Sequence, residues 1–329
     1  MLNTVALFAG CGGLDLGFEN AGFNIIWAND NNKKVADTYR FNHRNTELII
    51  KSLVDIKSED IPACDVIIGG PPCQSWSLAG AMKGKEDSRG QLFYEYVRVI
   101  KDKRPLAFVA ENVKGIVSKA HIKSFNEIVE MFKECGYTVT FKVVNAKNYG
   151  VPQDRERVFI VGIKNDLNVS YEFPEPTNNE GNYITLRDAI GDLRENPGNW
   201  MEGSFSPIFM SRNRRRGWNE VAFTVQASGR QTQIHPDSPA MEKIDTDKWQ
   251  FTKDDTKIVR RMSVRECARI QTFPDNFEFL GNPINENYKM IGNAVPVKLA
   301  EKVARQLMEC LSSANINNEV AITDLEMGK

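Results

Sequence analysis

Short apolar runs alternate with amphipathic helical patterns over the first half of the chain, and this alternation constrains the fold more than any other feature. Five runs have the length of buried strands, at residues 4–8, 24–28, 47–51, 65–68 and 106–110. Helical patterns lie between them, for example at residues 92–101 and 122–135. Strands that alternate with helices form βαβ units with parallel strands. The sequence therefore predicts an α/β fold with a doubly wound, mostly parallel sheet.

Two further apolar runs, residues 139–144 and 158–163, lie close together in the sequence. We expect them to pair as a hairpin that closes one edge of the sheet. Beyond Lys164 the periodicity fades, and residues 165–260 are rich in Pro, Asn, Gly and Arg with short mixed strands. Such a composition predicts a second, smaller and irregular domain.

Helical patterns return at residues 264–270 and 297–311, and the chain after Ser312 is polar. We therefore expect that tail to be frayed. The predicted organisation has three parts: a catalytic domain of residues 1–164 and 285–312, an irregular domain of residues 165–284, and a polar tail of residues 313–329.

The composition excludes several classes of protein. The net charge of −1 argues against a chain that binds polyanions with its whole surface, so a nucleic-acid surface would need local segregation of charge. No apolar stretch reaches the roughly 18 residues of a membrane span, and the N-terminus lacks the basic start of a signal peptide. Six scattered cysteines and three histidines indicate neither a disulfide framework nor a metal site. We expect a reduced, cytoplasmic protein, and a monomer, since no dimer interface is evident.

A glycine-rich loop, Phe8-Ala-Gly-Cys-Gly-Gly-Leu-Asp-Leu-Gly17, follows the first strand and opens a helix. Its glycines allow a ligand to approach the backbone, and a helix N-terminus favours an anionic group. The spacing is not G-x-G-x-x-G, which disfavours a dinucleotide, and a tight structural turn is nearly as good an explanation. Asp30, at the end of the second strand, is placed to accept hydrogen bonds from ribose hydroxyls. A helix cap is the alternative role for Asp30.

The sharpest motif is Gly69-Gly-Pro-Pro-Cys-Gln74, at the carboxyl end of a buried strand. Its two prolines remove donors and restrict the chain path, so they present Cys73 on a rigid turn where open α/β sheets bind ligands. An isolated cysteine is usually a small buried hydrophobe. A cysteine in this setting favours a nucleophile.

Three charged residues complete the candidate chemistry. Glu111 ends the fifth strand on the same edge of the sheet, where its carboxyl group could act as an acid near Cys73. Arg155 and Arg157, in Gln153-Asp-Arg-Glu-Arg157, could orient a planar polar substrate by bidentate hydrogen bonds. Helix capping for Glu111 and a surface ion-pair cluster for the arginines remain the alternatives.

Six motifs occur in one order along residues 4–308: the glycine-rich loop, Gly-Pro-Pro-Cys-Gln, Glu-Asn-Val, Gln-x-Arg-x-Arg, Arg265-Glu-Cys-Ala-Arg-Ile-Gln-x-Phe-Pro-Asp275 and Gly292-Asn-Ala-Val-Pro296. Together they resemble the motif series of the cytosine-5 DNA methyltransferases. The segments Ile208–Arg214 and Phe223–Gln231 resemble the target-recognition region of the GGCC-specific bacterial modification enzymes. The resemblance implies a class I S-adenosylmethionine-dependent methyltransferase fold, with the irregular domain as the target-recognition domain. It also implies a role in a restriction–modification pair, with a cognate endonuclease as functional partner.

The resemblance implies a set of residues around S-adenosylmethionine. They are Phe8, Gly10, Cys11, Gly12, Gly13, Leu14, Asp30, Ser52, Leu53, Pro71, Asn293 and Val295. The chain departs from the family at Asn31, where an aromatic residue usually packs on the adenine, a loss of about 1 kcal/mol of stacking. It departs again after the third strand, where the family has Gly-Asp-Ile: spacing favours Ser52-Leu53 as the match, and identity favours Asp55-Ile56.

The resemblance also implies a mechanism. Cytosine C5 is a poor nucleophile, so the Cys73 thiolate first adds to C6. Glu111 supplies or shares a proton with N3, and Arg157, with Arg155, holds O2 and the carboxylate. C5 then takes the methyl group, and loss of the C5 proton with release of Cys73 gives 5-methylcytosine. Because the target atom is inaccessible in a duplex, the base must be flipped out.

For the recognition of duplex DNA, the resemblance assigns Arg212, Arg214 and Arg230 to bases and Arg215, with Arg216, to phosphates. Arginine binds guanine O6 and N7 in the commonest specific contact, and GGCC offers guanines on both strands. Residues 201–235 hold five arginines, two glutamates and no lysine, a local excess of +3 in a nearly neutral chain. This segregation is what DNA binding requires.

Other functions remain as alternatives. A tRNA cytosine-5 methyltransferase would keep the chemistry, and an inactive DNA-binding paralogue would keep only the binding. The arginine-rich segment argues against the first, and intact Cys73, Glu111 and Arg157 argue against the second. An amino-methyltransferase would have Pro-Pro-Tyr or Pro-Pro-Trp at this position, and the glycine spacing disfavours a dehydrogenase.

Overall fold

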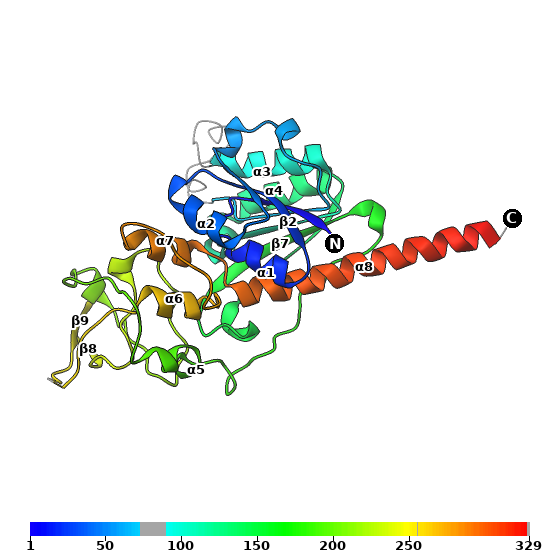
Figure 1. Ribbon diagram of the computed structural model, residues 1–329. Coiled ribbons are helices and arrows are strands. Elements are labelled where there is room, and N and C mark those ends of the chain that lie inside the picture. The colour runs from blue at the N-terminus through cyan, green and yellow to red at the C-terminus, as the bar shows by residue number, and fades with distance from the viewer. Residues whose placement is uncertain (73–89, 255, 328–329) are drawn as a thin grey trace.

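A seven-stranded sheet with helices on both faces forms the larger part of the computed structural model, which describes the backbone of residues 1–72, 90–254 and 256–327 (Figure 1). The strands are β1 (Asn3–Leu7), β2 (Asn24–Asp30), β3 (Glu47–Ile50), β4 (Val66–Gly69), β5 (Ala107–Val113), β6 (Tyr137–Asn145) and β7 (Glu156–Lys164). They lie in the order β3-β2-β1-β4-β5-β7-β6. The order reverses after β1, which makes the sheet doubly wound.

The first five strands in this order, β3, β2, β1, β4 and β5, are parallel, whereas β7 pairs antiparallel with both β5 and β6. The β6–β7 hairpin therefore closes one edge, with β7 next to β5. Both the predicted hairpin and the predicted mostly parallel sheet are confirmed. The register pairs Glu111 with Phe159 and Val113 with Arg157, so the ends of β5 and the start of β7 lie side by side.

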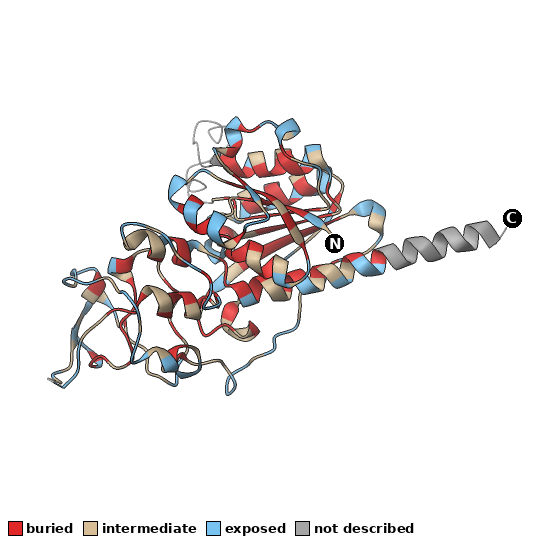
Figure 2. Cartoon of the chain, in the orientation of Figure 1, coloured by how far each residue is buried: buried red, intermediate tan, exposed pale blue. Residues whose placement is uncertain are grey.

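Two helical layers bury the two faces of the sheet. Helices α1 (Gly13–Asn20), α2 (Ala36–Asn42) and α8 (Val297–Met327) cover one face, and α3 (Gly90–Lys103) and α4 (Ile122–Glu134) cover the other. The buried residues of the strands lie between these layers (Figure 2). Gly17 lets α1 approach α8, because a Cβ atom there would lie 2.4 Å from Ala300 Cβ.

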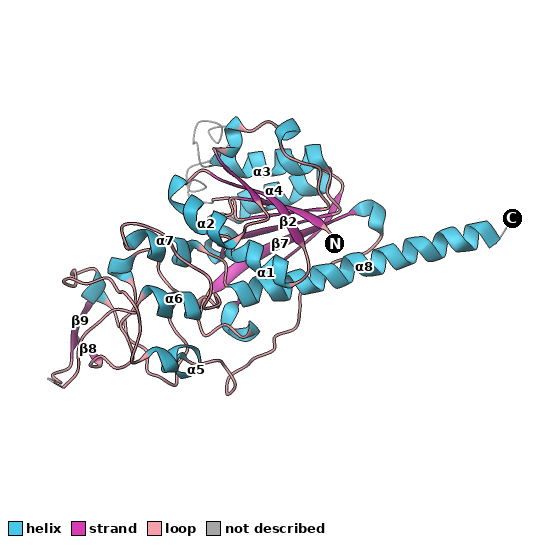
Figure 3. Cartoon of the chain, viewed as in Figure 1, coloured by secondary structure: helices cyan, strands magenta, loops and turns pink. Residues whose placement is uncertain are grey.

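The smaller lobe is mostly loops, which confirms its predicted irregular character (Figure 3). It contains α5 (Leu186–Ile190), the hairpin of β8 (Met241–Asp245) and β9 (Lys248–Phe251), and α6 (Val264–Ile270). Helix α6 begins with a capping box, in which Ser263 and Glu266 exchange hydrogen bonds.

Helix α7 (Asn285–Asn293) was not predicted as a helix, because its sequence is largely polar. Its buried residues Tyr288 and Ile291 share a hydrophobic core with Leu186 and Cys267 of the smaller lobe. The sequence groups α7 with the catalytic domain, and the structure places it between the two lobes.

The frayed tail is corrected by the structure. Helix α8 does not end at Leu311 but continues to Met327. Residues 312–327 contain neither proline nor glycine, so nothing in the segment interrupts a helix. No helix in the described part of the chain is long and apolar enough to cross a membrane.

Candidate active site

A cavity of about 780 Å³ opens at the carboxyl edge of the sheet. It is lined by the loops after β1, β2, β4 and β5, by the turn before β7 and by the end of α7. Open α/β sheets bind their ligands at this edge, where the strand order reverses. Predicted cofactor residues that line it are Phe8, Gly10, Cys11, Gly13, Leu14, Asp30, Pro71, Asn293 and Val295. Glu111, Arg155 and Arg157 line the same cavity, so the structure brings the two predicted sets together.

The loop after β1 is shaped around Asp30. The carboxylate accepts hydrogen bonds from the backbone N–H of Gly10 and of Asn32, each at 2.8 Å. Burial raises the pKa of Asp30, although these two donors oppose the shift. Phe8 and Gly10 both have positive φ, of 56° and 59°, a strained conformation for the phenylalanine that ligand-binding loops often hold. Asp30 is therefore fixed at the cavity wall with acceptor capacity to spare.

Helix α1 begins at the floor of this loop. Gly12 is its N-cap residue, with a φ of 88°, and its position lies directly against the imidazole of His43. A Cβ atom at residue 12 would lie 2.0 Å from His43 Nε2, so only glycine fits there. The predicted glycine thus serves the shape of the loop, and it does not itself line the cavity.

Two other predicted cofactor residues, Leu53 and Ser52, lie away from the cavity, whereas Cys11 lies at its border. Leu53 is 1% exposed and packs in the core beneath the sheet. Ser52 follows β3 directly, and neither residue is among the described residues that line the cavity. Cys11 borders the cavity, but its thiol lies 3.6 Å from the carbonyl oxygen of Met290, and burial raises its pKa to about 12. That thiol is held protonated and is no nucleophile.

The carboxyl and guanidinium groups of Glu111 and Arg157 form an ion pair within the cavity. Arg157 Nε lies 2.9 Å from Glu111 Oε1, and the two side chains are only 14% and 11% exposed. Burial raises the pKa of Glu111, while Arg157 and then Arg155 lower it. A carboxyl group with a raised pKa, oriented by an arginine, is suited to supplying a proton to a bound base.

Asn112 is a residue of this site that sequence reasoning missed. Its Nδ2 donates a 2.8 Å hydrogen bond to the Pro71 carbonyl, and its Oδ1 accepts from the N–H of Val113. Asn112 therefore ties the Gly-Pro-Pro turn to the end of β5, next to Glu111. The signal was present in the Glu-Asn-Val motif. Cys73, the predicted nucleophile, lies outside the described residues.

Arg155 does not face the cavity in the way its neighbour does. Its side chain is 1% exposed, and its guanidinium donates to the carbonyls of Gly292 at 2.9 Å and Ala294 at 3.0 Å. Burial and the nearby Arg157 lower the pKa of Arg155 to about 9. The structure thus shows Arg155 fastening residues 292–294 to the start of β7.

The arginines of the smaller lobe also include both exposed and buried side chains. Arg212 and Arg230 are exposed, whereas Arg214 is 5% exposed and lies over the ring of Phe209. Arg214 donates to the carbonyls of Phe209 and Ile208 and to Gln231 Oε1 at 2.9 Å. These bonds hold two stretches of the lobe together and so bring the neighbours of Arg214 and Gln231, Arg212 and Arg230, into one region.

Arg215 and Arg216, predicted to meet phosphates, also have partners within the lobe. Arg215 donates to the carbonyls of Ser238, at 2.8 Å, and Pro236, at 2.5 Å. Arg216 forms an ion pair with Glu220 at 2.9 Å and lies over the ring of Phe223. Both Arg214 and Arg215 use Nε and Nη2 in their bonds to the protein, so a contact to DNA would be made by Nη1 or would require one of these bonds to be exchanged.

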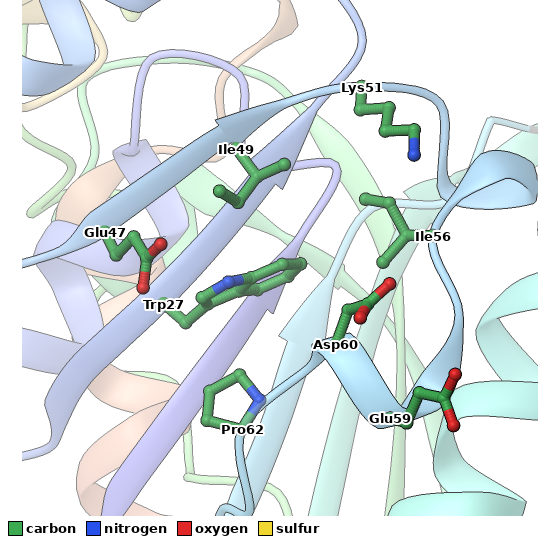
Figure 4. A pocket seen from close by; sticks show the side chains of 8 residues that line it. All are labelled: Trp27, Glu47, Ile49, Lys51, Ile56, Glu59, Asp60 and Pro62. Atoms are coloured by element: carbon green, nitrogen blue, oxygen red, sulfur yellow. The ribbon is translucent and has the colours of Figure 1, made fainter.

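A second cavity, of about 320 Å³, lies against β2 and β3, away from these groups (Figure 4). Its lining is Trp27, Glu47, Ile49, Lys51, Ile56, Glu59, Asp60 and Pro62. None of the predicted site residues lines it. Of these two cavities, only the larger is lined by predicted catalytic and cofactor-binding residues.

A doubly wound sheet whose carboxyl edge holds a glycine-rich loop, a fixed acidic residue and a buried carboxyl–arginine pair defines a Rossmann-like methyltransferase. The family model of the C-5 cytosine-specific DNA methylases matches residues 2–309, and the chain belongs to this family. It is a DNA cytosine-5 methyltransferase of the restriction–modification type.

Three relatives are similar over nearly their whole lengths. Type II methyltransferase M.FnuDI of Fusobacterium nucleatum is 50% identical, over 94% of this chain and 95% of the relative. M.NgoPII of Neisseria gonorrhoeae is 48% identical, over 94% and 96%. M.MthTI of Methanothermobacter thermautotrophicus is 50% identical, over 94% and 98%.

Solved structures share the fold at much lower identity. A mutant of DNMT2 from Spodoptera frugiperda superposes with a TM-score of 0.69 at 17% identity, over 94% of this chain and all of that one. The Dnmt2 methyltransferase of S. pombe gives a TM-score of 0.67 at 18% identity, over 94% and 99%. These likenesses confirm the predicted fold class.

Proposed function

We propose that this enzyme transfers the methyl group of S-adenosylmethionine to C5 of the internal cytosine of GGCC in duplex DNA. The observation that carries the proposal is that the loop around Asp30 and the Glu111–Arg157 pair line the same cavity. Methylation at GGCC would protect DNA from a cognate endonuclease, and a cytoplasmic location follows from that role. The choice of GGCC rests on the resemblance of residues 208–231 to the GGCC-specific enzymes.

The residues present fit S-adenosylmethionine. The Asp30 carboxylate is aimed at the cavity and retains lone pairs for ribose hydroxyls. The N-terminus of α1, with Gly13 and Leu14 at the cavity wall, suits the carboxylate of the methionine moiety. Phe8, Asn293 and Val295 would close the remaining sides. When bound, the cofactor supplies an electrophilic methyl group.

The chain's own residues would then perform the activation of cytosine. The Cys73 thiolate adds to C6, and the electron pair of the C5–C6 double bond moves to C5. Glu111, whose pKa is raised by burial, supplies or shares a proton with N3 as charge develops there. Arg157 holds the Glu111 carboxyl group and offers its remaining N–H groups to O2.

C5 forms the new bond to the methyl carbon as the bond between that carbon and the sulfonium sulfur breaks. A base then removes the C5 proton, the electron pair of the C5–H bond expels the Cys73 thiolate, and N3 returns its proton to Glu111. The product is 5-methylcytosine, and the enzyme is regenerated. Asn112 has a supporting part in these steps, because it holds the Pro71 carbonyl two residues before Cys73. For the base to reach this cavity it must leave the duplex, at a cost of a few kcal/mol.

Recognition of the site is proposed for Arg212 and Arg230, the exposed arginines of the smaller lobe. Each could bind a guanine through O6 and N7. Arg214 and Arg215 stay as proposed DNA contacts through Nη1, since Nε and Nη2 of each donate to acceptors within the protein. Their observed bonds support a role in shaping the recognition surface.

Bisulfite sequencing tests the proposal. Duplex DNA is incubated with the purified protein and S-adenosylmethionine, beside a Cys73→Ser control. Protected cytosines confined to the internal cytosine of GGCC, and absent in the control, are the expected result. Protection at another sequence would retain the chemistry and overturn the GGCC assignment. Methylated tRNA without methylated DNA would overturn the DNA substrate, and cofactor binding with no methylation of either would indicate an inactive paralogue.

A further inference from the structure

Helix α7 lies between the cofactor cavity and the recognition segment, here residues 223–231. At its start, Asn285 Oδ1 accepts a 2.9 Å hydrogen bond from the N–H of Gly229, the residue before Arg230. At its end, Met290, Gly292 and Asn293 line the cavity. Nine residues of helix span about 13 Å, so one rigid element contacts both regions.

A buried pair of amide side chains holds the end of α7 against the segment that leads into β7. Gln153 Nε2 donates to Gln271 Oε1 at 2.8 Å, and both side chains are fully buried. Gln271 Nε2 in turn donates to the carbonyls of Ile291, at 2.7 Å, and Ala294, at 3.1 Å. The same pair reaches the recognition segment, since Gln153 Oε1 accepts from the N–H of Val225 at 2.8 Å.

The junction is closely packed as well as hydrogen-bonded. A Cβ atom at Gly292 would lie 2.4 Å from the backbone nitrogen of Ala227, so the two backbones are in direct contact. Arg155 joins the same three segments, because its guanidinium contacts the carbonyls of Val225, Gly292 and Ala294. Thr224 completes the attachment with a 2.7 Å bond from its hydroxyl to the Asp154 carbonyl.

We propose that α7 and the Gln153–Gln271 pair couple the two binding sites, so that cofactor and duplex each increase the enzyme's affinity for the other. The inference rests on the proposed function. Its physical basis is that the buried amides exclude water, so a displacement of residues 291–294 cannot occur without moving Val225 or leaving polar groups unpaired. A ligand that fixes one end of α7 therefore orders the other end in advance.

Gln271→Met tests the coupling, because methionine has a similar length and lacks the amide. The affinity for S-adenosylhomocysteine is measured by calorimetry, with and without a saturating GGCC duplex, and the ratio of the two values is the coupling factor. We expect a factor of about fivefold or more in the wild type. The variant should fall below about twofold. The duplex affinity, measured with and without S-adenosylhomocysteine, must give the same factor, because binding linkage is reciprocal.

Two further variants keep the test decisive. Gln306→Met, on α8 and away from the junction, is the matched control and should retain the wild-type factor. Asn285→Ala removes the contact at the other end of α7 and should also lower the factor. It stands in if circular dichroism shows that Gln271→Met does not fold.

The outcomes separate the inference from the function on which it rests. A wild-type factor of one overturns the coupling, and so does an unchanged factor in the folded variants. Equal losses of both separate affinities at a constant factor would show a merely structural role and overturn it too. A wild type that binds neither probe would instead overturn the proposed function, and the coupling with it.

Discussion

Two short segments, residues 153–157 of the larger lobe and residues 212–216 of the smaller lobe, use arginine in parallel ways. In each, one arginine is buried and donates to backbone carbonyls: Arg155 to Gly292 and Ala294, and Arg214 to Ile208 and Phe209. In each, the arginine two positions away has a different environment. Arg157 pairs with Glu111 at 2.9 Å, whereas Arg212 is exposed to solvent.

The difference between Arg157 and Arg212 agrees with the tasks proposed for them. A catalytic group gains from being oriented before the substrate arrives, and the ion pair to Glu111 provides that orientation. A group that recognises a base must present free donors, because the base supplies the acceptors. In both segments the buried arginine shapes the backbone that carries its neighbour. The following changes test this division, from the largest expected effect to the smallest.

Glu111→Gln should reduce the rate of methyl transfer by about 10²–10⁴-fold, because glutamine keeps a hydrogen bond to Arg157 and cannot supply the proton. Single-turnover transfer from labelled S-adenosylmethionine measures the rate. Glu156→Gln is the matched control, since Glu156 is exposed on the neighbouring strand β7, next to Arg157, and pairs with Lys114. A loss of less than tenfold in Glu111→Gln would remove Glu111 from the proposed acid role.

The two lobes should respond to acid with opposite signs. Burial raises the pKa of Asp15, beneath the cofactor loop, to about 6 from the usual 3.8. The folded protein then binds the extra proton first, so Asp15 adds stability as pH falls from about 6 to 4. Burial lowers the pKa of His235, in the smaller lobe, to about 4, with Glu266 opposing. The unfolded chain binds that proton first, so stability falls as pH drops from about 6.5 to 4.

Urea unfolding between pH 4 and 7 measures both effects. Asp15→Asn should remove the gain in acid and His235→Asn the loss, each by up to about 3 kcal/mol. Tyr39, which donates a 2.6 Å bond to Asp15, can donate equally to asparagine. Parallel pH profiles for the wild type and both variants would show that neither group titrates as described.

Arg214→Ala and Arg212→Ala should fail in different assays. Loss of the Arg214 guanidinium leaves buried carbonyls and Gln231 without a donor, so the free energy of unfolding should fall by about 1–3 kcal/mol. Loss of Arg212 should leave stability within about 0.5 kcal/mol of the wild type. It should reduce discrimination between GGCC and a substituted site by about 1–3 kcal/mol. The reverse pattern would contradict the division drawn above.

Arg269→Ala should have the smallest effect. Arg269 pairs with Asp192 at 3.0 Å and Asp275 at 2.5 Å, but both carboxylates are about 60% exposed. Surface ion pairs contribute little, so chemical unfolding should show a loss below about 1 kcal/mol, with methylation unchanged. A larger loss would mean that the motif at residues 265–275 stabilises the smaller lobe more strongly than the exposure of its ion pairs indicates.

The regular half of the molecule was predictable because its signals are local. Apolar runs of strand length mark β1 to β7, and the Gly-Pro-Pro turn and Glu111 fall at strand ends, where topology brings them to one edge. Helix α7 was missed because only three of its residues, Tyr288, Met290 and Ile291, carry an apolar signal. The end of α8 was misjudged because a polar composition does not by itself interrupt a helix.

The sequence by itself identified the family, because its motifs occur in a fixed order, and the same motifs supply the proposed nucleophile, acid and cofactor loop. Only the tertiary structure decided which charged groups are available for that chemistry. Arg155 and Arg157 differ by two positions, and no property of either residue tells which one meets Glu111 and which one meets the carbonyls of residues 292 and 294. The carbonyls that accept from Arg155 are far from it in the chain: Gly292 is 137 positions away, and Ala294 is 139 positions away. The partner of a buried charge is thus set by long-range packing, which local sequence does not encode.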